Sequence, residues 1–247
     1  MVIREICARP NAASAKSLLL GLLSGLLLCA CAGSVVRTPP SPWIPDEAWW
    51  IEAGLHGGSF VAGSGYTRFV KASHARNLYE VRRSIQEQSG IPVSIALRVS
   101  RALNAYATDR DGERVVTLTL ALLEAIGDDR DALATSIGHE VAHLYYAHGA
   151  TRRIRNQPIL ANSTAFAGIN AVNTSFSRYE EREADSKGME WAIAAGFSPC
   201  GVTRTFRILA ANGEDAESDP FLSSHPDHQE RIERANEMSL RLTGTPC

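Results

Sequence analysis

The chain has 247 residues, of which 45% are hydrophobic and 21% are charged, so it can bury a sizeable core and is not disordered throughout. Its 25 Lys and Arg residues nearly balance 27 Asp and Glu residues, so it lacks the strong positive charge typical of nucleic-acid-binding proteins, and we expect no nucleic-acid partner. Apolar residues form one long run, near the N-terminus, which argues against a polytopic membrane protein.

The N-terminal residues have the pattern of an export signal. Basic residues precede the segment 18–28, which contains only Leu, Gly and Ser. This segment is too short to span a bilayer but has the length of the apolar core of a signal peptide. We therefore predict a signal peptide of the lipoprotein type over 1–30. A Pro-rich stretch follows at 31–46, and we expect it to form an extended tether.

Cys31 comes directly after the predicted signal peptide. The sequence Leu28-Cys29-Ala30-Cys31 resembles the lipobox of bacterial lipoproteins, which implies that Cys31 becomes the lipidated first residue of the mature chain. Because Ala32 rather than Asp follows Cys31, the resemblance to bacterial lipoproteins implies that the protein is sorted to the periplasmic face of the outer membrane. An ordinary signal peptide, cleaved nearby and leaving no anchor, is the alternative.

Two cysteines, Cys200 and Cys247, remain after removal of residues 1–30 and acylation of Cys31. In the oxidising compartment that such a signal implies, they are candidates for a disulfide that ties the C-terminal end to the domain. Two unpaired buried thiols are the alternative, because the sequence does not measure the separation of the two residues.

Residues 47–247 have the periodicities of a single α+β domain, mainly helical with a small sheet. We expect the glycine-rich segment 47–66 to be irregular. The residues 159–175 show no pattern that predicts a particular secondary structure. Alternating apolar residues predict strands at 91–100 and 114–120, the second of which follows the turn signal Asp111-Gly112. Helical spacing predicts helices at 67–88, 128–147, 179–195 and 226–242.

The motif with the most chemical content is His139-Glu140-Val141-Ala142-His143. On a helix, the imidazoles of His139 and His143 point to the same side and can converge on one metal ion, with Glu140 beside them but angled away. Apolar residues such as Leu133 and Ile137 fall on the opposite stripe, which can pack on a core. This pattern is typical of zinc metallopeptidases. The alternative is a helix whose histidines only make hydrogen bonds in the core or at the surface.

A second acidic segment, Ser177-Arg178-Tyr179-Glu180-Glu181-Arg182-Glu183-Ala184-Asp185, follows some tens of residues later. A two-His zinc site needs a third protein ligand and an open position. Together the two segments resemble the gluzincin family of HtpX-like and CAAX-prenyl-protease-like zinc metallopeptidases, above all its short periplasmic lipoprotein branch, which is LoiP-like. The resemblance implies a zincin-like fold with a small mixed β-sheet beside the active-site helix, and one Zn²⁺ per chain. It also implies Glu181 as the third ligand and Asp185 as an acceptor that orients a ligand His. A solvated helix face is the alternative.

Two further segments match this family. Asn104-Ala105-Tyr106-Ala107 resembles its Asn-Ala-Phe-Ala segment at the rim of the cleft, which implies substrate contacts for Asn104, Ala105 and Tyr106.

The second segment, Ser224-His225-Pro226 followed by Arg231, resembles the Thr-His-Pro segment of the family, which implies that His225 lies near the metal. His225 and Arg231 are therefore candidate catalytic donors to the oxyanion. For His225, metal ligation in a resting state and a place beside the helix N-cap are alternatives. We expect His148 to be a partner of the helix dipole rather than a ligand.

The resemblance implies a zinc-dependent endopeptidase of the bacterial cell envelope, in which Glu140 is the general base for a zinc-activated water. Its substrates would be unfolded or misfolded envelope proteins, in protein quality control, and a lipid anchor would hold it on the membrane. A non-hydrolytic zinc-containing lipoprotein that acts as a chaperone-like binding protein is the alternative. A third possibility is cleavage of peptidoglycan cross-links. Glu140 favours an enzyme, because a purely structural zinc site has no use for a base.

Overall fold

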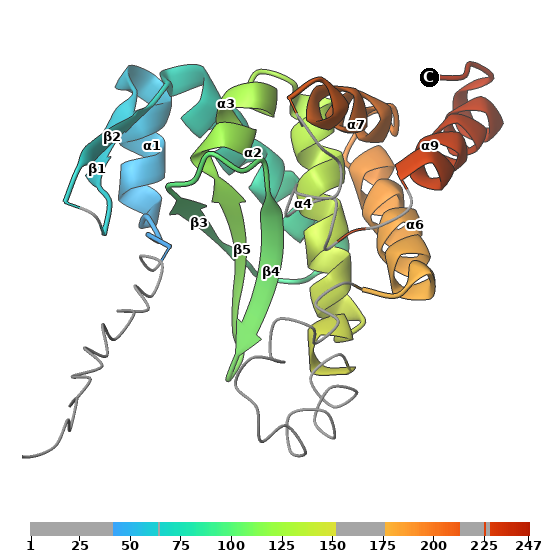
Figure 1. The fold of residues 1–247 in the computed structure, drawn as a ribbon, viewed down its shortest axis with the longest axis horizontal. Helices are drawn as coiled ribbons and strands as arrows, with labels where there is room; N and C mark the ends of the chain where they lie inside the picture. The colour runs from blue at the N-terminus through green and yellow to red at the C-terminus, as the bar shows by residue number, and fades with distance from the viewer. Residues whose placement is uncertain (1–41, 64, 152–175, 213–224, 226–227) are drawn as a thin grey trace, which may run out of the picture. The chain divides into compact units, whose positions relative to one another are not determined.

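The computed structural model describes residues 42–63, 65–151, 176–212, 225 and 228–247, all of which belong to the unit Pro39–Cys247. Helices dominate, with two small sheets (Figure 1), which confirms the predicted α+β class and zincin-like architecture. The predicted signal peptide, the lipidation site Cys31, most of the tether and the segment 159–175 lie outside the described residues.

In chain order the elements are α1 (Glu47–His56), β1 (Gly58–Val61), β2 (Thr67–Val70), α2 (Ala72–Ser89), β3 (Ser94–Arg98), β4 (Ala105–Arg110), β5 (Glu113–Thr119), α3 (Leu120–Ile126), α4 (Arg130–Tyr145), α6 (Arg178–Ala194), α7 (Gly201–Asn212) and α9 (His228–Thr243).

The segment 47–66, predicted to be irregular, instead forms α1 and most of a β-hairpin with β2. Asp46 caps α1 by accepting a hydrogen bond from the backbone N–H of Trp49 at 2.8 Å. At Gly58 an added Cβ would lie 2.3 Å from the Trp49 ring. The prediction was wrong because this glycine allows close packing of the strand on the helix and does not break regular structure.

The end of the predicted tether is part of the folded unit. The backbone N–H of Trp43 donates to the carbonyl of Leu97 in β3 at 2.9 Å, and the N–H of Leu97 donates back at 2.8 Å. The ring of Trp43 also stacks on Phe60, with 4.5 Å between the centroids. The folded unit therefore begins a few residues before α1.

The larger sheet has the strand order β3-β5-β4, in which β3 runs parallel and β4 antiparallel to β5. This is the predicted small mixed sheet, but β4 was not expected as a strand. The turn signal joins β4 to β5, and both of its residues have positive φ angles, 55° at Asp111 and 88° at Gly112. Within the described residues β4 is an edge strand, and it lies beside α4 (Figure 1).

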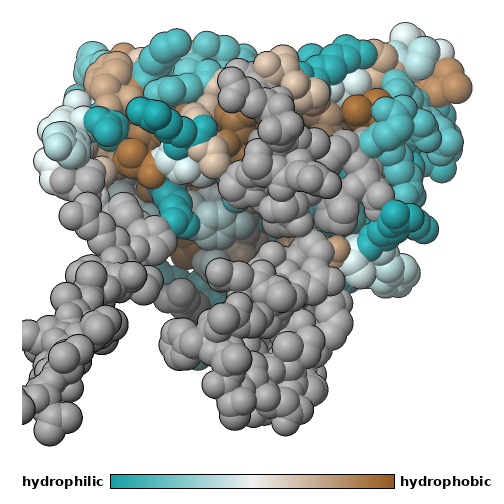
Figure 2. All heavy atoms as spheres, viewed as in Figure 1, coloured by the Kyte–Doolittle hydropathy of each residue, from teal (hydrophilic) through white to brown (hydrophobic). Residues whose placement is uncertain are grey.

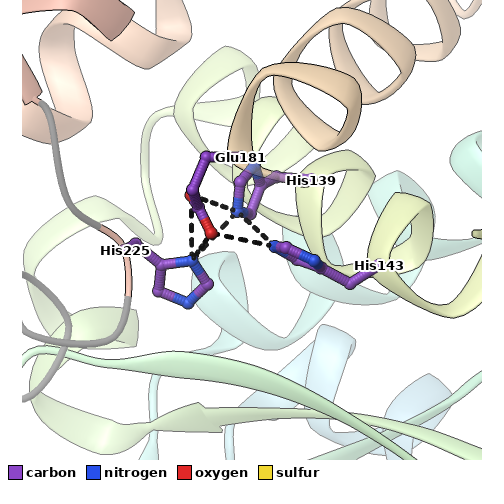
Figure 3. Close-up of side chains that lie close together, drawn as sticks. All are labelled: His139, His143, Glu181 and His225. Carbon is purple, nitrogen blue, oxygen red and sulfur yellow. Dashed lines mark hydrogen bonds and ion pairs between the residues drawn. The ribbon is translucent and has the colours of Figure 1, made fainter. Parts of the chain in front are cut away.

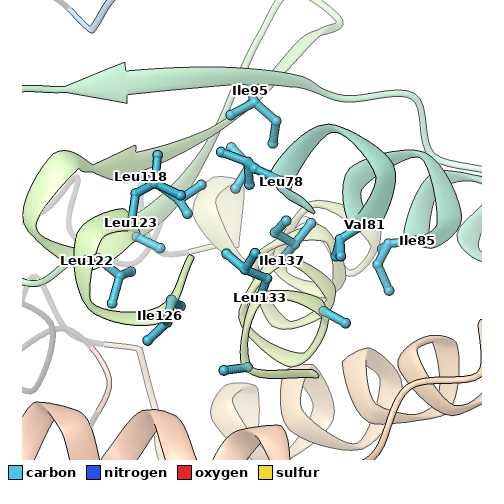
Figure 4. Packing of buried hydrophobic residues seen from close by; sticks show 14 of the residues in the cluster. Leu78, Val81, Ile85, Ile95, Leu118, Leu122, Leu123, Ile126, Leu133 and Ile137 are labelled. Carbon is cyan, nitrogen blue, oxygen red and sulfur yellow. The ribbon is translucent and has the colours of Figure 1, made fainter. Parts of the chain in front are cut away.

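The hydrophobic core lies between α2, α3, α4 and the larger sheet (Figure 4). The helix predicted at 67–88 begins at Ala72, because its first residues form β2, and it ends at Ser89, where Gly90 caps it. Leu133 and Ile137 of α4 have 0% of their surface exposed, as their predicted stripe requires. Helices α3 and α7 were not predicted.

A disulfide joins Cys200, at the start of α7, to Cys247, beyond the end of α9, as the sequence suggested. It closes a loop of 47 residues that contains α9. Hydrophilic residues predominate over α6 and α9 on the face shown in Figure 2. In the described part of the chain, no helix is both long enough and apolar enough for a membrane crossing.

Candidate metal centre

Four buried side chains bring their nitrogen and oxygen atoms together in the interior: His139, His143, Glu181 and His225. One atom of each lies within 4.8 Å of the others, and we call this set the donor group. Figure 3 shows that His139 and His143 come from one helix, α4, and face Glu181 on α6, while His225 approaches from another segment. The structure thus brings together the three residues named as ligands and adds His225 to them.

The distances within the donor group fit a bound cation. Nε2 of His143 lies 3.0 Å from Nε2 of His139 and 3.4 Å from Oε1 of Glu181. Nδ1 of His225 lies 3.2 Å from Nε2 of His139 and 3.0 Å from Oε1 of Glu181. Facing imidazole nitrogens need a proton or a cation between them. Imidazole nitrogens with one carboxylate are also a donor set that divalent transition metals and zinc prefer, so these residues can hold such an ion.

The backbones of α4 and α6 touch beside the donor group. A Cβ added to Gly138 would lie 2.7 Å from the carbonyl oxygen of Gly188, and one added to Gly188 would lie 2.5 Å from the amide nitrogen of His139. This close approach places Glu181 opposite the two α4 histidines. Sequence reasoning missed both glycines, although small residues on two facing helices are a signal for such a contact.

The start of α6 is fixed by a capping box. The backbone N–H of Glu180 donates to Oγ of Ser177 at 3.2 Å, and the N–H of Ser177 donates to Oε2 of Glu180 at 2.7 Å. Because Glu181 is the next residue, this cap also sets the direction in which its side chain leaves the helix.

Asp185 contacts the His139 ring, and Arg231 contacts Asp185 in turn. Oδ1 of Asp185 lies 2.9 Å from Nδ1 of His139, which is the place expected for an orienting acceptor. Arg231 donates to Asp185 through Nε at 2.8 Å and Nη2 at 2.6 Å, and its Nη1 lies 3.1 Å from Oε2 of Glu181. Burial raises the pKa of Asp185, but the charge of Arg231 and the contact with His139 outweigh it and lower the pKa to about 2.

The pKa of Glu181 is also held well below its usual range. Burial raises it, but the neighbouring His225 and His139 overcome that effect. Glu181 is therefore an ionised acceptor, the form that binds a metal ion.

Glu140 lies beside the donor group without belonging to it. Its side chain is buried, and its Oε1 has no hydrogen-bond partner among the residues that the structure describes. A buried carboxylate oxygen without a hydrogen bond is unfavourable, and in a native protein it indicates a group kept for a ligand or for chemistry. Glu140 is also the residue that the sequence motif predicts as the general base.

Asn104, Ala105 and Tyr106 lie at the start of β4. The amide N–H of Asn104 donates to Oγ1 of Thr119 at 3.0 Å, Ala105 is buried, and the hydroxyl of Tyr106 accepts from Arg98 at 3.3 Å.

A groove lies next to the donor group, and later residues of β4 line it. Its volume is about 700 Å³, and β4 contributes Ala107, Thr108 and Asp109 to one side while His143 and Leu144 of α4 lie on the other. Sequence reasoning included Ala107 in the family-like segment without giving it a role, and it did not identify Thr108 or Asp109, because it did not predict the strand.

The sequence model of Peptidase family M48 matches residues 73–239, which include α4, α6 and the segment of His225. The chain belongs to this family. This M48 metallopeptidase is 24% identical to "Metalloprotease LoiP" of Escherichia coli over 192 residues, which are 70% of this chain and 73% of LoiP.

Two other relatives are similar over shorter parts. "Protease HtpX homolog" of Thermococcus sibiricus is 35% identical over 42% of this chain and 32% of its own length. "Mitochondrial metalloendopeptidase OMA1" of Arabidopsis thaliana is 32% identical over 52% of this chain and 29% of its own length. The M48 chain is therefore a LoiP-like metalloendopeptidase that acts on polypeptides.

Proposed function

We propose that this M48 metallopeptidase is a zinc-dependent endopeptidase of the bacterial cell envelope. The observation that carries the proposal is the buried convergence of His139, His143 and Glu181, with Glu140 beside them but outside the donor group. Two imidazoles and a carboxylate are a known ligand set of catalytic zinc. Zinc held there supplies a Lewis acid for a water molecule and for the scissile carbonyl.

The residues of the chain have separate tasks in this hydrolysis. Glu140 takes the proton of the attacking water on Oε1, which has no hydrogen-bond partner among the described residues, and delivers it to the leaving amine. Arg231 holds Asp185 and Glu181 in place, and because its guanidinium already contacts both carboxylates, we assign it to positioning rather than to the oxyanion. His225 lies within the donor group, so we assign it to a closed state that precedes entry of the substrate.

The groove beside β4 is the proposed binding place of the substrate. An extended polypeptide can add to an edge strand through backbone hydrogen bonds, which are independent of its side chains. Small residues such as Ala107 and Ala147 line the groove, so we expect loose selectivity. Unfolded or misfolded envelope proteins expose such extended segments, which is why we propose a role in quality control. We further propose that Asn104 and Tyr106 contact the substrate at the start of the same edge, and that Ala105, whose side chain is buried, does so only through its backbone.

We further propose that 1–30 is a signal peptide and that lipidation of Cys31 anchors the domain, 47–247, at the periplasmic face of the outer membrane. The lipobox-like Leu28-Cys29-Ala30-Cys31 supports this proposal. Labelling of cells with a palmitate analogue should mark the wild-type protein and not the Cys31→Ser variant. Label that persists in the variant would exclude this anchor.

Cleavage of casein tests the proposed activity. The purified protein should degrade casein, a chelator should stop the reaction, and added Zn²⁺ should restore it. A protein that suppresses aggregation of casein without cutting it, with or without Glu140, would instead be the chaperone-like binding protein.

A further inference from the structure

His143 has a partner on the side that faces away from the donor group. In Figure 3 one of its ring nitrogens faces the dashed contacts and the other points away from them. That second nitrogen, Nδ1, lies 2.9 Å from Nδ1 of His148, which is 4% exposed. Nε2 of His148 lies 3.3 Å from Oε2 of Glu183, and the hydroxyl of Tyr179 donates to Oε1 of Glu183 at 2.8 Å. The contacts form a chain from the donor group to the exposed Tyr179 on α6.

One arrangement of protons satisfies this whole chain when His143 binds a metal through Nε2. Its Nδ1 then carries a hydrogen, and Nδ1 of His148 accepts it. His148 in turn carries its hydrogen on Nε2 and donates it to Glu183. The carboxylate of Glu183 accepts from His148 on one oxygen and from Tyr179 on the other. Every contact has one donor and one acceptor, so the chain fixes the tautomer that leaves Nε2 of His143 free for the metal.

The backbone after α4 is shaped to bring His148 back to His143. Ala147 has a φ angle of 55°, in the left-handed region that a residue with a Cβ rarely adopts and that costs free energy. The turn at Ala147 places His148 beside His143, and the ring of Tyr146 stacks on His148 with 5.3 Å between centroids. An unfavourable conformation held by the surrounding structure at this point indicates that the position of His148 matters.

We propose that His148 and Glu183 are positioning residues of the metal centre, which hold His143 with its Nε2 aimed at the ion. Asp185 contacts His139 directly, whereas Glu183 acts on His143 through His148. Sequence reasoning assigned neither role: it took His148 for a partner of the helix dipole and gave Glu183 no part in the site. The inference rests on the proposed zinc site.

The test measures the dissociation constant for Zn²⁺ of the purified protein, by competition with a chromophoric chelator. His148→Phe and Glu183→Ala should each raise this constant about tenfold or more, as loss of a group that orients a ligand commonly does. Glu190→Ala is the matched control, since Glu190 is an exposed carboxylate on the same helix that pairs with Lys187. It should leave the constant within about twofold of the wild type.

Two further variants separate positioning from a merely structural effect. The double variant His148→Phe with Glu183→Ala should bind no more weakly than His148→Phe alone, because Glu183 acts only through His148. Glu183→Gln should restore most of the affinity, since its amide oxygen can still accept from His148. The unfolding free energy of each metal-free variant shows whether it is folded.

The results distinguish this inference from the proposed function. A wild-type protein that binds no zinc overturns the zinc site itself. A wild-type protein that binds zinc while Glu183→Ala binds equally well, or no worse than Glu190→Ala, overturns only the positioning role. Should His148→Phe fail to fold, Glu183→Ala decides the question, because the side chain of Glu183 is 29% exposed and tolerates replacement more easily.

Discussion

Nε2 of His225 lies 3.6 Å from Oε1 of Glu140. The same ring contacts Glu181 through Nδ1 at 3.0 Å, so it occupies the space between the donor group and the proposed base. A hydrolytic zinc site needs an open position for water beside its base. Under the proposed function, His225 fills this position in the described arrangement and would have to move before a substrate enters.

His225→Ala should raise the rate of peptide hydrolysis several-fold, because it opens the position beside Glu140. It should also weaken zinc binding, because one donor of the group is lost. Initial rates on a fluorogenic peptide at saturating Zn²⁺ measure the first effect, with the exposed His56→Ala as control. If the rate falls instead, His225 takes part in turnover as an oxyanion donor.

Glu140→Gln should abolish peptide cleavage while zinc binding stays within a few-fold of the wild type. The amide has the shape of the carboxylate but cannot take a proton from water, and loss of a general base typically costs about 10²–10⁴ in rate. Bound zinc is measured on the purified variant, and Glu124→Gln, an exposed carboxylate on α3, is the control. Cleavage at the normal rate would show that another group is the base.

Gly188→Ala should separate α4 from α6 and weaken the metal site. The new Cβ would lie 2.5 Å from the amide nitrogen of His139, so the helices must move apart. Overpacking of this kind costs about 1–3 kcal/mol of stability. Gly149→Ala is the control, since no atom lies within 4 Å of its added Cβ. Urea unfolding and zinc titration measure both effects, and normal values in Gly188→Ala would mean that the contact does not set the site.

Without metal, the protein should lose stability as the pH falls below about 6.5. Burial holds the pKa of His143 well below its usual value, against the opposing effect of Glu181, so the folded state keeps this ring neutral while the unfolded chain takes up a proton. The free energy of unfolding should therefore decrease from about pH 6.5 downward. In His143→Gln the decrease should be smaller, and an identical pH profile would assign the effect to other groups.

Local patterns predicted much of the site. The helical period alone put His139 and His143 on one side of α4 and Leu133 in the core. Contacts between distant segments could not be read in this way. Gly138 meets Gly188 only because two helices cross there, and this depends on the packing of the whole domain.

Backbone conformation also limited the prediction. Helical geometry separates His148 from His143, but the left-handed φ of Ala147 removes that separation, and alanine gives no sign of such an angle in a sequence. The strand β4 was missed for a related reason, since an edge strand with polar residues lacks the alternation of a strand that is buried on one face.

The order of the segments along the chain has a consequence for biosynthesis. Glu181 and Asp185 both contact the guanidinium of Arg231, which lies on α9, some tens of residues later in the chain. Until α9 has been synthesised, Arg231 cannot pair with these two carboxylates, and burying them without it would be unfavourable. The metal centre should therefore reach its described arrangement only after α9 has been made, which would protect the nascent chain from premature digestion.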